Sequence, residues 1–376
     1  MRFKVSTKPL IEGLKLGVVN ANISNFYTRS TIAQIKADKS TLTVNLEAES
    51  ILSEIRFKGI GDSDEPAMIF VDCALLKQLV STFETAVTEF EFTENGLVLH
   101  AGKSRFTLPQ LIDEDVDMTL KSPTVPDYTG NEIELNKDDW KFIKDHQMFA
   151  IAMSFLYPIY RNVWVGESGN VLVGDFDTSM FTSSNKSKLG KTCLLSDTII
   201  NLFNNLPEGA KLVPNNKNYV VKVETDGFDF LSEFTPMYED VDDTGNYMSE
   251  IILGLMEFDE STGVKVSAGA INKALNQAAL LSSNSEDKIT LSVFNDHITL
   301  ADENIDCNIP VAVVSNIESY EIEFKTVSLK SVMSNVPDDD LIIAPMYTSD
   351  DSGEGQSLTG IVVKSADLTA VLSGAD

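Results

Sequence analysis

One pattern recurs three times along this chain: a short extended run followed by an amphipathic helix, beginning near residues 68, 192 and 321. In each helix four apolar residues fall at positions i, i+3, i+4 and i+7, which is one helical face. These residues are Leu76, Leu79, Val80 and Phe83, then Ile199, Leu202, Phe203 and Leu206, then Leu329, Val332, Met333 and Val336. The step from Leu76 to Ile199 is 123 residues and the step from Ile199 to Leu329 is 130. A period this long predicts similar domains in tandem rather than a solenoid of small repeats.

A second, less regular helix precedes each copy, over residues 6–21, 136–155 and 266–282. Short segments with strand alternation or β-branched residues follow each helix, separated by turns rich in Asn, Gly, Asp and Ser. We therefore predict an α+β fold of three domains, each with two helices and antiparallel sheets. Connectors at 109–131 and 239–263 place these domains at 1–126, 127–241 and 242–376, and an inserted segment at 242–263 opens the third.

The net charge of −28 is distributed unevenly. The three helices above and those at 71–83, 195–208 and 325–336 together carry +2, so the rest of the chain carries −30. Neutral to basic helices keep nucleic acid open as a partner of an acidic chain. The sequence has neither an apolar run of about 18 residues nor an apolar stretch typical of a signal peptide at its start. We expect a cytoplasmic protein with no membrane partner.

Histidine and cysteine are the candidates for metal or nucleophilic chemistry, and each type falls once in each third: His100, His146, His297, Cys73, Cys193 and Cys307. None has the spacing of a metal site, and scattered cysteines favour free thiols over disulfides. The common nucleotide-binding and acyl-transfer signatures are absent from the sequence. Acidic runs such as 338–340 lack the spacing of a calcium loop. We expect a protein that is not an enzyme and that holds no cofactor or metal.

Several strings occur in an order and spacing found in one known family. SRFTLPQL follows GLVLHAGK in the first third, NLPEGAKL precedes FTPMYED in the second, and EIEFKTVSLKSVMSNVPDDDLIIA lies in the third. Over essentially its whole length, the chain resembles bacterial DNA polymerase III β subunits, the sliding clamps. The resemblance implies a head-to-tail homodimeric ring of six DNA-clamp domains, with helices lining the hole. Such a ring is a processivity factor: a clamp loader places it around duplex DNA, where it tethers the DNA polymerase and other clients.

Helix lysines are the candidates for contacts with DNA. A sliding ring must hold phosphates loosely and without reading sequence, which lysines supply as point charges. We predict that eight lysines face the duplex: Lys8, Lys15, Lys77, Lys137, Lys141, Lys144, Lys273 and Lys330. The alternative for any single lysine is an ordinary solvated helix face, and Asp138, Asp139 and Asp145 share one of these helices.

The resemblance also implies two protein interfaces. Phe106 would meet Leu280 and Leu281 of a second copy, although core packing is the alternative for the two leucines. A pocket between the second and third domains would bind client peptides through Tyr160, Asp177, Thr178, Met180, Phe181, Pro236, Val241, Val362 and Val363. The chain departs from the family there: Thr178, Ser179 and Met180 replace a Gly-His-Arg run, and KSADLTAVLSGAD follows the segment aligned with the family's terminal strand.

Two other interpretations fit the same residues. The first is an acidic clamp-like scaffold or decoy that binds proteins without encircling DNA. The second is a hydrolase with a carboxylate site at Asp175 and Asp177, which the scarcity of catalytic motifs disfavours.

Overall fold

The structure is a computed structural model of the whole chain. It describes all residues except 18–30, 49, 112–118, 125–131, 136–161, 168, 176–178, 184–188, 190–191, 216, 238–252, 255–256, 258, 282–286, 312–316, 337–339, 350–355, 367 and 376. Side chains of 174–183, 335 and 349 are also outside the description.

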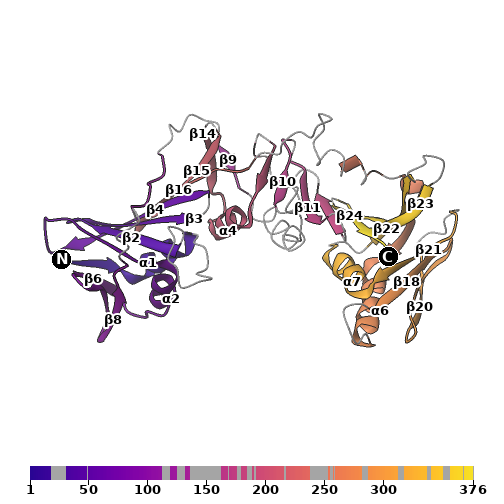
Figure 1. Cartoon of the computed structure of the whole chain (residues 1–376), viewed down its shortest axis with the longest axis horizontal. Coiled ribbons are helices and arrows are strands. Elements are labelled where there is room, and N and C mark those ends of the chain that lie inside the picture. The colour runs from indigo at the N-terminus through magenta and orange to yellow at the C-terminus, as the bar shows by residue number, and fades with distance from the viewer. Residues whose placement is uncertain are drawn as a thin grey trace. The chain divides into compact units, whose positions relative to one another are not determined.

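A module of one strand, one helix and three strands repeats along the chain (Figure 1). Its first copy is β1 (Arg2–Ser6), α1 (Thr7–Leu16), β2 (Ile32–Ala37), β3 (Thr41–Ala48) and β4 (Ile51–Gly61). Its second copy is β5 (Ala67–Asp72), α2 (Cys73–Ser81), β6 (Val87–Thr93), β7 (Gly96–Ala101) and β8 (Ser104–Pro109). These two copies fill the predicted first domain.

The last third and the described elements of the middle third follow the same order. The middle third has β9 (Ile133–Glu134), β10 (Val163–Val165), β11 (Val171–Asp175) and β12 (Ser179–Ser183), then β13 (Cys193–Leu195), α4 (Asp197–Asn205), β14 (Lys211–Asn215), β15 (Asn218–Glu224) and β16 (Phe228–Phe234). The last third, after a 3-10 turn at Glu260–Thr262, has β17 (Val264–Ser267), α6 (Ala268–Leu281), β18 (Lys288–Val293), β19 (His297–Ala301) and β20 (Asp306–Pro310), then β21 (Tyr320–Lys325), α7 (Thr326–Asn335), β22 (Asp340–Ser349), β23 (Gln356–Lys364) and β24 (Leu368–Ser373). The α+β prediction is confirmed, while the helix predicted over 136–155 lies outside the described residues.

Local sequence explains where two of the repeated helices, α2 and α4, begin. Asp72 caps α2 by accepting a hydrogen bond from the backbone N–H of Leu75 at 2.7 Å, and Ser196 caps α4 in the same way. The predicted apolar faces are buried with one exception: Leu79 of α2 is only half-buried, whereas Leu202 and Val332 at the same position of α4 and α7 are fully buried. The second copy of the module therefore has an apolar position that is only partly covered.

The chain packs into two compact units, each built from parts of two predicted domains. Unit 1 consists of Met1–Trp140 and Leu195–Met237, and unit 2 of Lys141–Leu194 and Tyr238–Asp376. In unit 1, β4 pairs antiparallel with β16, and in unit 2, β12 pairs antiparallel with β24 (Figure 1). Both pairs cross a predicted domain border, which explains why the units do not follow the thirds. The three-domain division stays a prediction.

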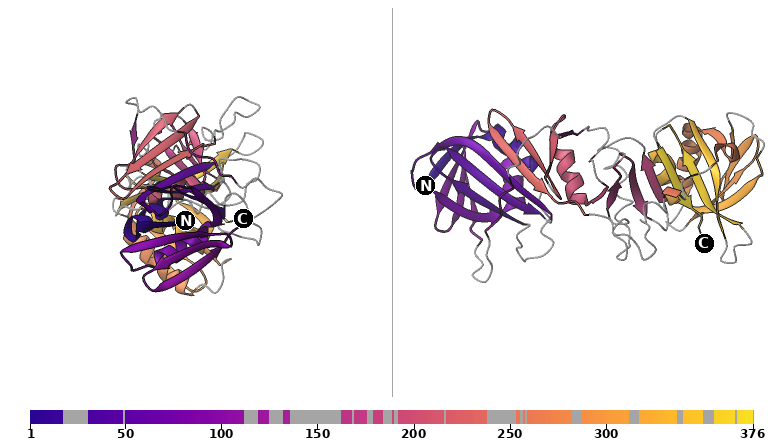
Figure 2. Two further views of the ribbon diagram at one scale, coloured as in Figure 1. Left: turned by 90° about the vertical axis from the view of Figure 1, so that its left-hand side faces the viewer. Right: turned by 90° about the horizontal axis from the view of Figure 1, so that it is seen from above.

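Each unit has a large antiparallel sheet. In unit 1 the strand order is β8-β7-β6-β1-β4-β16-β15-β14-β9, and β5, β2 and β3 branch from β4. Unit 2 has one sheet with the order β13-β10-β11-β12-β24-β23-β22-β17 and a second with the order β20-β19-β18-β21. The helices α1 and α2 contact each other in unit 1, as α6 and α7 do in unit 2 (Figures 1 and 2).

The first connector is anchored to its sheet. Leu111 packs against Ile32 and the partly buried Phe70, and the backbone N–H of Thr124 donates to the carboxylate of Glu233 at 2.7 Å. Apolar and charge-assisted contacts therefore hold the described ends of this segment on unit 1.

The C-terminus differs from the expectation of an extension beyond the terminal strand. Residues 368–373 form β24, which pairs with both β12 and β23 inside the sheet of unit 2. Val362 and Val363 therefore lie on the strand before the last one, and both are buried. The prediction was wrong because β23 and β24 form a tight hairpin, in which the backbone N–H of Ser365 donates to the carbonyl of Leu368.

We predict that Phe234→Ala lowers the free energy of unfolding by about 3–5 kcal/mol. The Phe234 ring is fully buried, meets Phe203 edge to face at a centroid distance of 5.1 Å and stacks on Tyr219 at 5.3 Å. Chemical denaturation measures the change. Met68→Ala is the control, because its side chain is half exposed and its truncation changes stability by only about 0.5 kcal/mol. Equal effects of the two variants would contradict this account of the core.

Candidate functional site

Most of the helix lysines that the structure describes have side chains outside the apolar core. Lys8, Lys15 and Lys273 are exposed, and Lys330 is half-buried. The side chain of Lys8 is 87% exposed, and its 3.9 Å pair with Glu12 on the same helix is too open to neutralise it strongly. Lys137, Lys141 and Lys144 lie outside the described residues.

Lys77 is oriented differently from the prediction. Its ammonium group turns toward α1 and donates to the carbonyl of Gly17 at 2.6 Å, at the end of that helix. Burial lowers the pKa of Lys77, and the position suits a cation because helix carbonyls point outward at a C-terminus. Lys77 therefore fastens α2 to α1 in this structure rather than facing solvent.

The predicted interface residues are exposed or half exposed. Leu280 is 84% exposed and Leu281 is 54% exposed at the end of α6, so the core alternative for both leucines is wrong. Phe106 is half-buried on β8 and stacks on Phe83 at a centroid distance of 5.4 Å. Leu75 on α2 is a further exposed leucine, which sequence reasoning missed because it lies beside the apolar face of the helix.

Two strands that end a module, β8 and β20, lie at free edges among the described strands, whereas the equivalent strands of the other modules are paired with one another. The last strand before the midpoint of each third is β4, β12 or β20, and the last strand of each third is β8, β16 or β24. β4 pairs with β16 and β12 pairs with β24, which leaves β20 and β8 at the ends of their sheets. Open edges of this kind are templates for pairing with another chain.

The two free edges carry opposite charge. Lys103 and Arg105 lie at the β7–β8 turn and on β8, and both are exposed. Asp302, Glu303 and Asp306 lie at the β19–β20 turn and on β20. A contact between the two edges would bring charges of opposite sign together.

The structure leaves the client pocket untested. Tyr160, Asp177, Thr178 and Val241 lie outside the described residues. Met180 and Phe181 are on β12, where they pair with Val371 and Ala370 of β24. Val362 and Val363 are buried in unit 2, and Pro236 is buried in unit 1. The pocket therefore stays a prediction.

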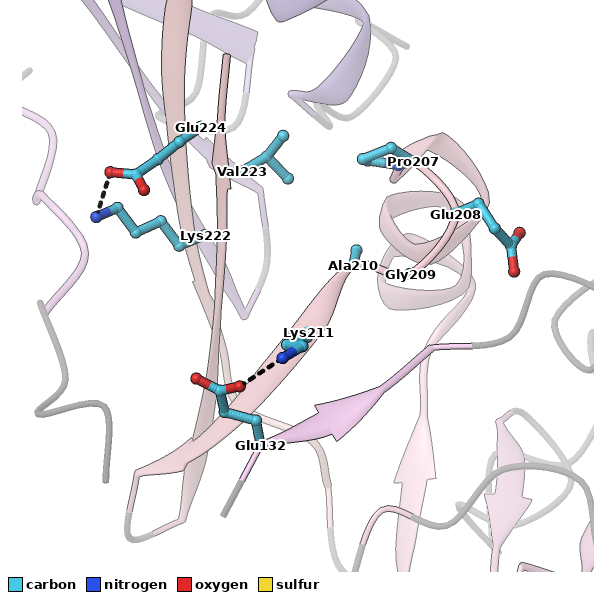
Figure 3. A pocket seen from close by; sticks show the side chains of 9 residues that line it. All are labelled: Glu132, Pro207, Glu208, Gly209, Ala210, Lys211, Lys222, Val223 and Glu224. Atoms are coloured by element: carbon cyan, nitrogen blue, oxygen red, sulfur yellow. Dashed lines mark hydrogen bonds and ion pairs between the residues drawn. The ribbon is translucent and has the colours of Figure 1, made fainter. Parts of the chain in front are cut away.

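Unit 1 has an open pocket of about 410 Å³ at the end of α4 (Figure 3). Lys211 donates to Glu132 at 2.9 Å, which raises the pKa of Lys211, and Lys222 pairs with Glu224 at 2.6 Å. Because a carboxylate engages each lysine and Glu208 adds a further negative charge, the pocket offers no surplus positive charge to a phosphate.

The described histidines have surface partners rather than catalytic ones. His100 lies 2.8 Å from the carboxylate of Glu91, whose pKa is lowered by hydrogen bonds from His100 and Arg2. His297 lies 2.7 Å from Asp296, and His146 is outside the described residues. Across the described ranges no cluster of three His, Cys, Asp or Glu side chains fits a metal ion. In the same ranges no helix is long and apolar enough to cross a membrane.

We predict that, in dissociated single chains, one of the three thiols reacts rapidly with Ellman's reagent at pH 8. Burial raises the pKa of Cys73 and of Cys193 to about 12, so both stay protonated and shielded, whereas Cys307 on β20 is half-buried. Absorbance of the released thionitrobenzoate measures the rate. Cys307→Ser should remove the fast phase, and a fast phase that survives this change would contradict the assignment.

The fold is that of bacterial DNA polymerase III β sliding clamps. The chain is similar over its full length to the DNA polymerase III subunit β of Pseudomonas aeruginosa, with 17% identity, a TM-score of 0.72 and 100% of both chains covered. It is similar to the Caulobacter crescentus polymerase III β, with 15% identity, a TM-score of 0.74 and 100% of both chains covered. A Helicobacter pylori β clamp bound to a DNA ligase peptide matches with 12% identity and a TM-score of 0.69, again over 100% of both chains.

The resemblance found in the sequence is therefore confirmed at the level of the fold: this chain folds as a bacterial polymerase III β clamp. Comparisons with family profiles and with curated proteins give no match.

Proposed function

We propose that this chain is a DNA polymerase processivity factor that encircles duplex DNA as a homodimeric ring. The observation that carries the proposal is the pair of free edges at β8 and β20. Successive thirds are joined by the pairing of β4 with β16 and by the pairing of β12 with β24, and β20 and β8 are the equivalent strands that have no such partner within the described chain. A head-to-tail contact between two copies would use both members and close the ring. The full-length similarity to sliding clamps supports the same arrangement.

The helices would supply the DNA-facing surface. Lys8, Lys15 and Lys273 are exposed on α1 and α6, which are the first helices of the first and last thirds. Lysines that bind phosphates as point charges hold a duplex without sequence preference, and acidic strands keep DNA from other surfaces. The proposed role is topological and electrostatic, without catalysis or a cofactor, in the cytoplasm.

Other proteins would act on the ring. A clamp loader would open it, and the polymerase and further clients would bind it through short peptides, as the DNA ligase peptide bound to the H. pylori clamp illustrates. The predicted pocket around β12 is the proposed site for these peptides. The alternative is an acidic scaffold that does not encircle DNA, and the net charge of −28 is the observation that favours it.

A plasmid retention experiment tests the ring. Chains are dissociated at high salt, returned to about 0.15 M salt together with nicked circular plasmid, and separated by gel filtration, with sedimentation giving the oligomer mass. A ring should elute with the circular plasmid and be released when a restriction enzyme cuts it. Equal retention on circular and linear DNA would indicate ordinary binding, and a dimer that is not retained at all would favour the scaffold.

A further inference from the structure

A notch in the sheet of unit 1 lies just after α4 and forms the pocket of about 410 Å³ (Figure 3). β14 begins at Lys211, opposite Lys222 of β15, and β15 continues beyond this pair to Val223 and Glu224. Residues 207–210, which connect α4 to β14, form the other wall. The volume lies in the range of small-ligand sites, so the notch has room for one long side chain of a bound peptide.

Hydrogen bonds of the backbone fix the wall after α4. The N–H of Ala210 donates to the carbonyl of Pro207 at 3.2 Å, and the N–H of Leu135 donates to the carbonyl of Ala210 at 2.9 Å. β9 also pairs with β14, which places Glu134 opposite Lys211. The notch is therefore formed before any ligand binds, and a preformed site has a lower entropic cost of binding.

The charges around the notch do not cancel. Each of its two lysines is already paired with one carboxylate, as Figure 3 shows. Glu208 also lines the pocket, and Glu134 lies next to Gly209, since a Cβ on Gly209 would be 3.7 Å from Oε1 of Glu134. Both of these glutamates are exposed. Their carboxylates are in excess of the lysines, so the notch carries surplus negative charge on both sides of an unsubstituted Cα.

A cation on an apolar stem matches this lining. Pro207, Ala210 and Val223 supply an apolar surface, along which the methylene groups of an arginine side chain can pack. A guanidinium group has five N–H donors in a fixed plane, engages carboxylates in a defined geometry and is more weakly hydrated than an ammonium group. A phosphate would instead meet like charge.

We propose that this notch binds an arginine side chain on a segment of a partner protein, with the guanidinium group held by Glu134 and Glu208. All the residues involved belong to unit 1 of a single chain, so the inference goes beyond the proposed ring and does not depend on it. The site would give a partner protein a contact made of different residues from those of the predicted client pocket.

An NMR titration with two peptides tests the site. Both are short Gly-Ser peptides with blocked ends, one with a central arginine and one with citrulline, which has nearly the same shape without the charge. At about 0.15 M salt the arginine peptide should shift the backbone amide signals of Gly209 and Ala210, and it should bind roughly tenfold or more tightly than the citrulline peptide. Glu134→Gln combined with Glu208→Gln should remove this preference.

Glu65→Gln combined with Glu94→Gln is the matched control, because these glutamates are also exposed in unit 1 and their replacement changes the net charge equally. The control variant should keep the preference for arginine. Equal losses in the two variants would show a general attraction of cations to the acidic chain and overturn the site. Equal binding of the two peptides, or no shift of Gly209 at millimolar peptide, would also overturn it. Neither result bears on the ring, which plasmid retention tests separately.

Discussion

Replacing Leu280 and Leu281 with aspartate is expected to convert a two-chain assembly into single chains of 41.3 kDa. Both leucines are exposed at the end of α6, so their change leaves the core of unit 2 intact. Burying two leucines contributes about 3–6 kcal/mol to an interface, which corresponds to roughly 10²- to 10⁴-fold in the dissociation constant. Charged aspartates at the same place add a desolvation cost. Sedimentation at micromolar concentration measures the mass.

Ile60→Asp is the matched control for the leucine change. Ile60 is 74% exposed at the end of β4, which β7, β6 and β1 separate from β8, and its replacement introduces one negative charge on an apolar surface, against two in the leucine variant. The control should sediment like the unchanged protein. Dissociation by both changes would point to a general effect of added negative charge, and a dimer that survives the leucine change would remove α6 from the interface.

Periodicity in the sequence was sufficient to predict the repeated helices and their buried faces. The i, i+3, i+4, i+7 faces are set by local chemistry, because each apolar stripe is buried against other elements, and α2 and α4 begin at side-chain caps. For that reason Ile199 and Leu329 are buried where the repeat places them. Leu79 departs from the pattern because it is only half-buried, and the burial of a side chain depends on packing by other elements, which periodicity within one helix cannot reveal.

Strand pairing was less predictable because it depends on partners far apart in sequence. The pairing of β4 with β16 joins Phe57 to Phe228, and no local signal marks that match. The same limit explains the missed β24: its residues Leu368–Ser373 alternate weakly, and its place between β12 and β23 is decided by the sheet.

Single side chains were the least predictable level of the candidate site. Helical position placed Lys77 away from the apolar face, but an unpaired carbonyl at the end of α1 attracts its ammonium group. The exposure of Leu280 also has no local signature, since a leucine at the end of a helix reads equally well as core or as interface. These positions are decided by neighbouring elements, so they required the structure.

Replacing Lys8 and Lys15 with glutamate is expected to weaken binding of a short DNA duplex by at least about tenfold at low salt, and to do so equally for unrelated DNA sequences. Both lysines are exposed on α1, and each phosphate contact adds about 0.9 to the slope of log affinity against log salt. Two copies of the chain lose up to four lysines, so the slope should fall by roughly 2–4. Fluorescence anisotropy across a salt series measures both quantities.

The matched control carries the same charge change on the strands. Lys39 and Lys58 are exposed at the β2–β3 turn and on β4, and replacing both with glutamate changes the net charge by the same amount as the helix variant. If DNA lies against the helices, this control variant keeps the salt slope of the unchanged protein and loses little affinity for the duplex. Equal losses in the two variants would mean that duplex DNA responds to the overall charge of the chain, and the helix lysines would have no special role.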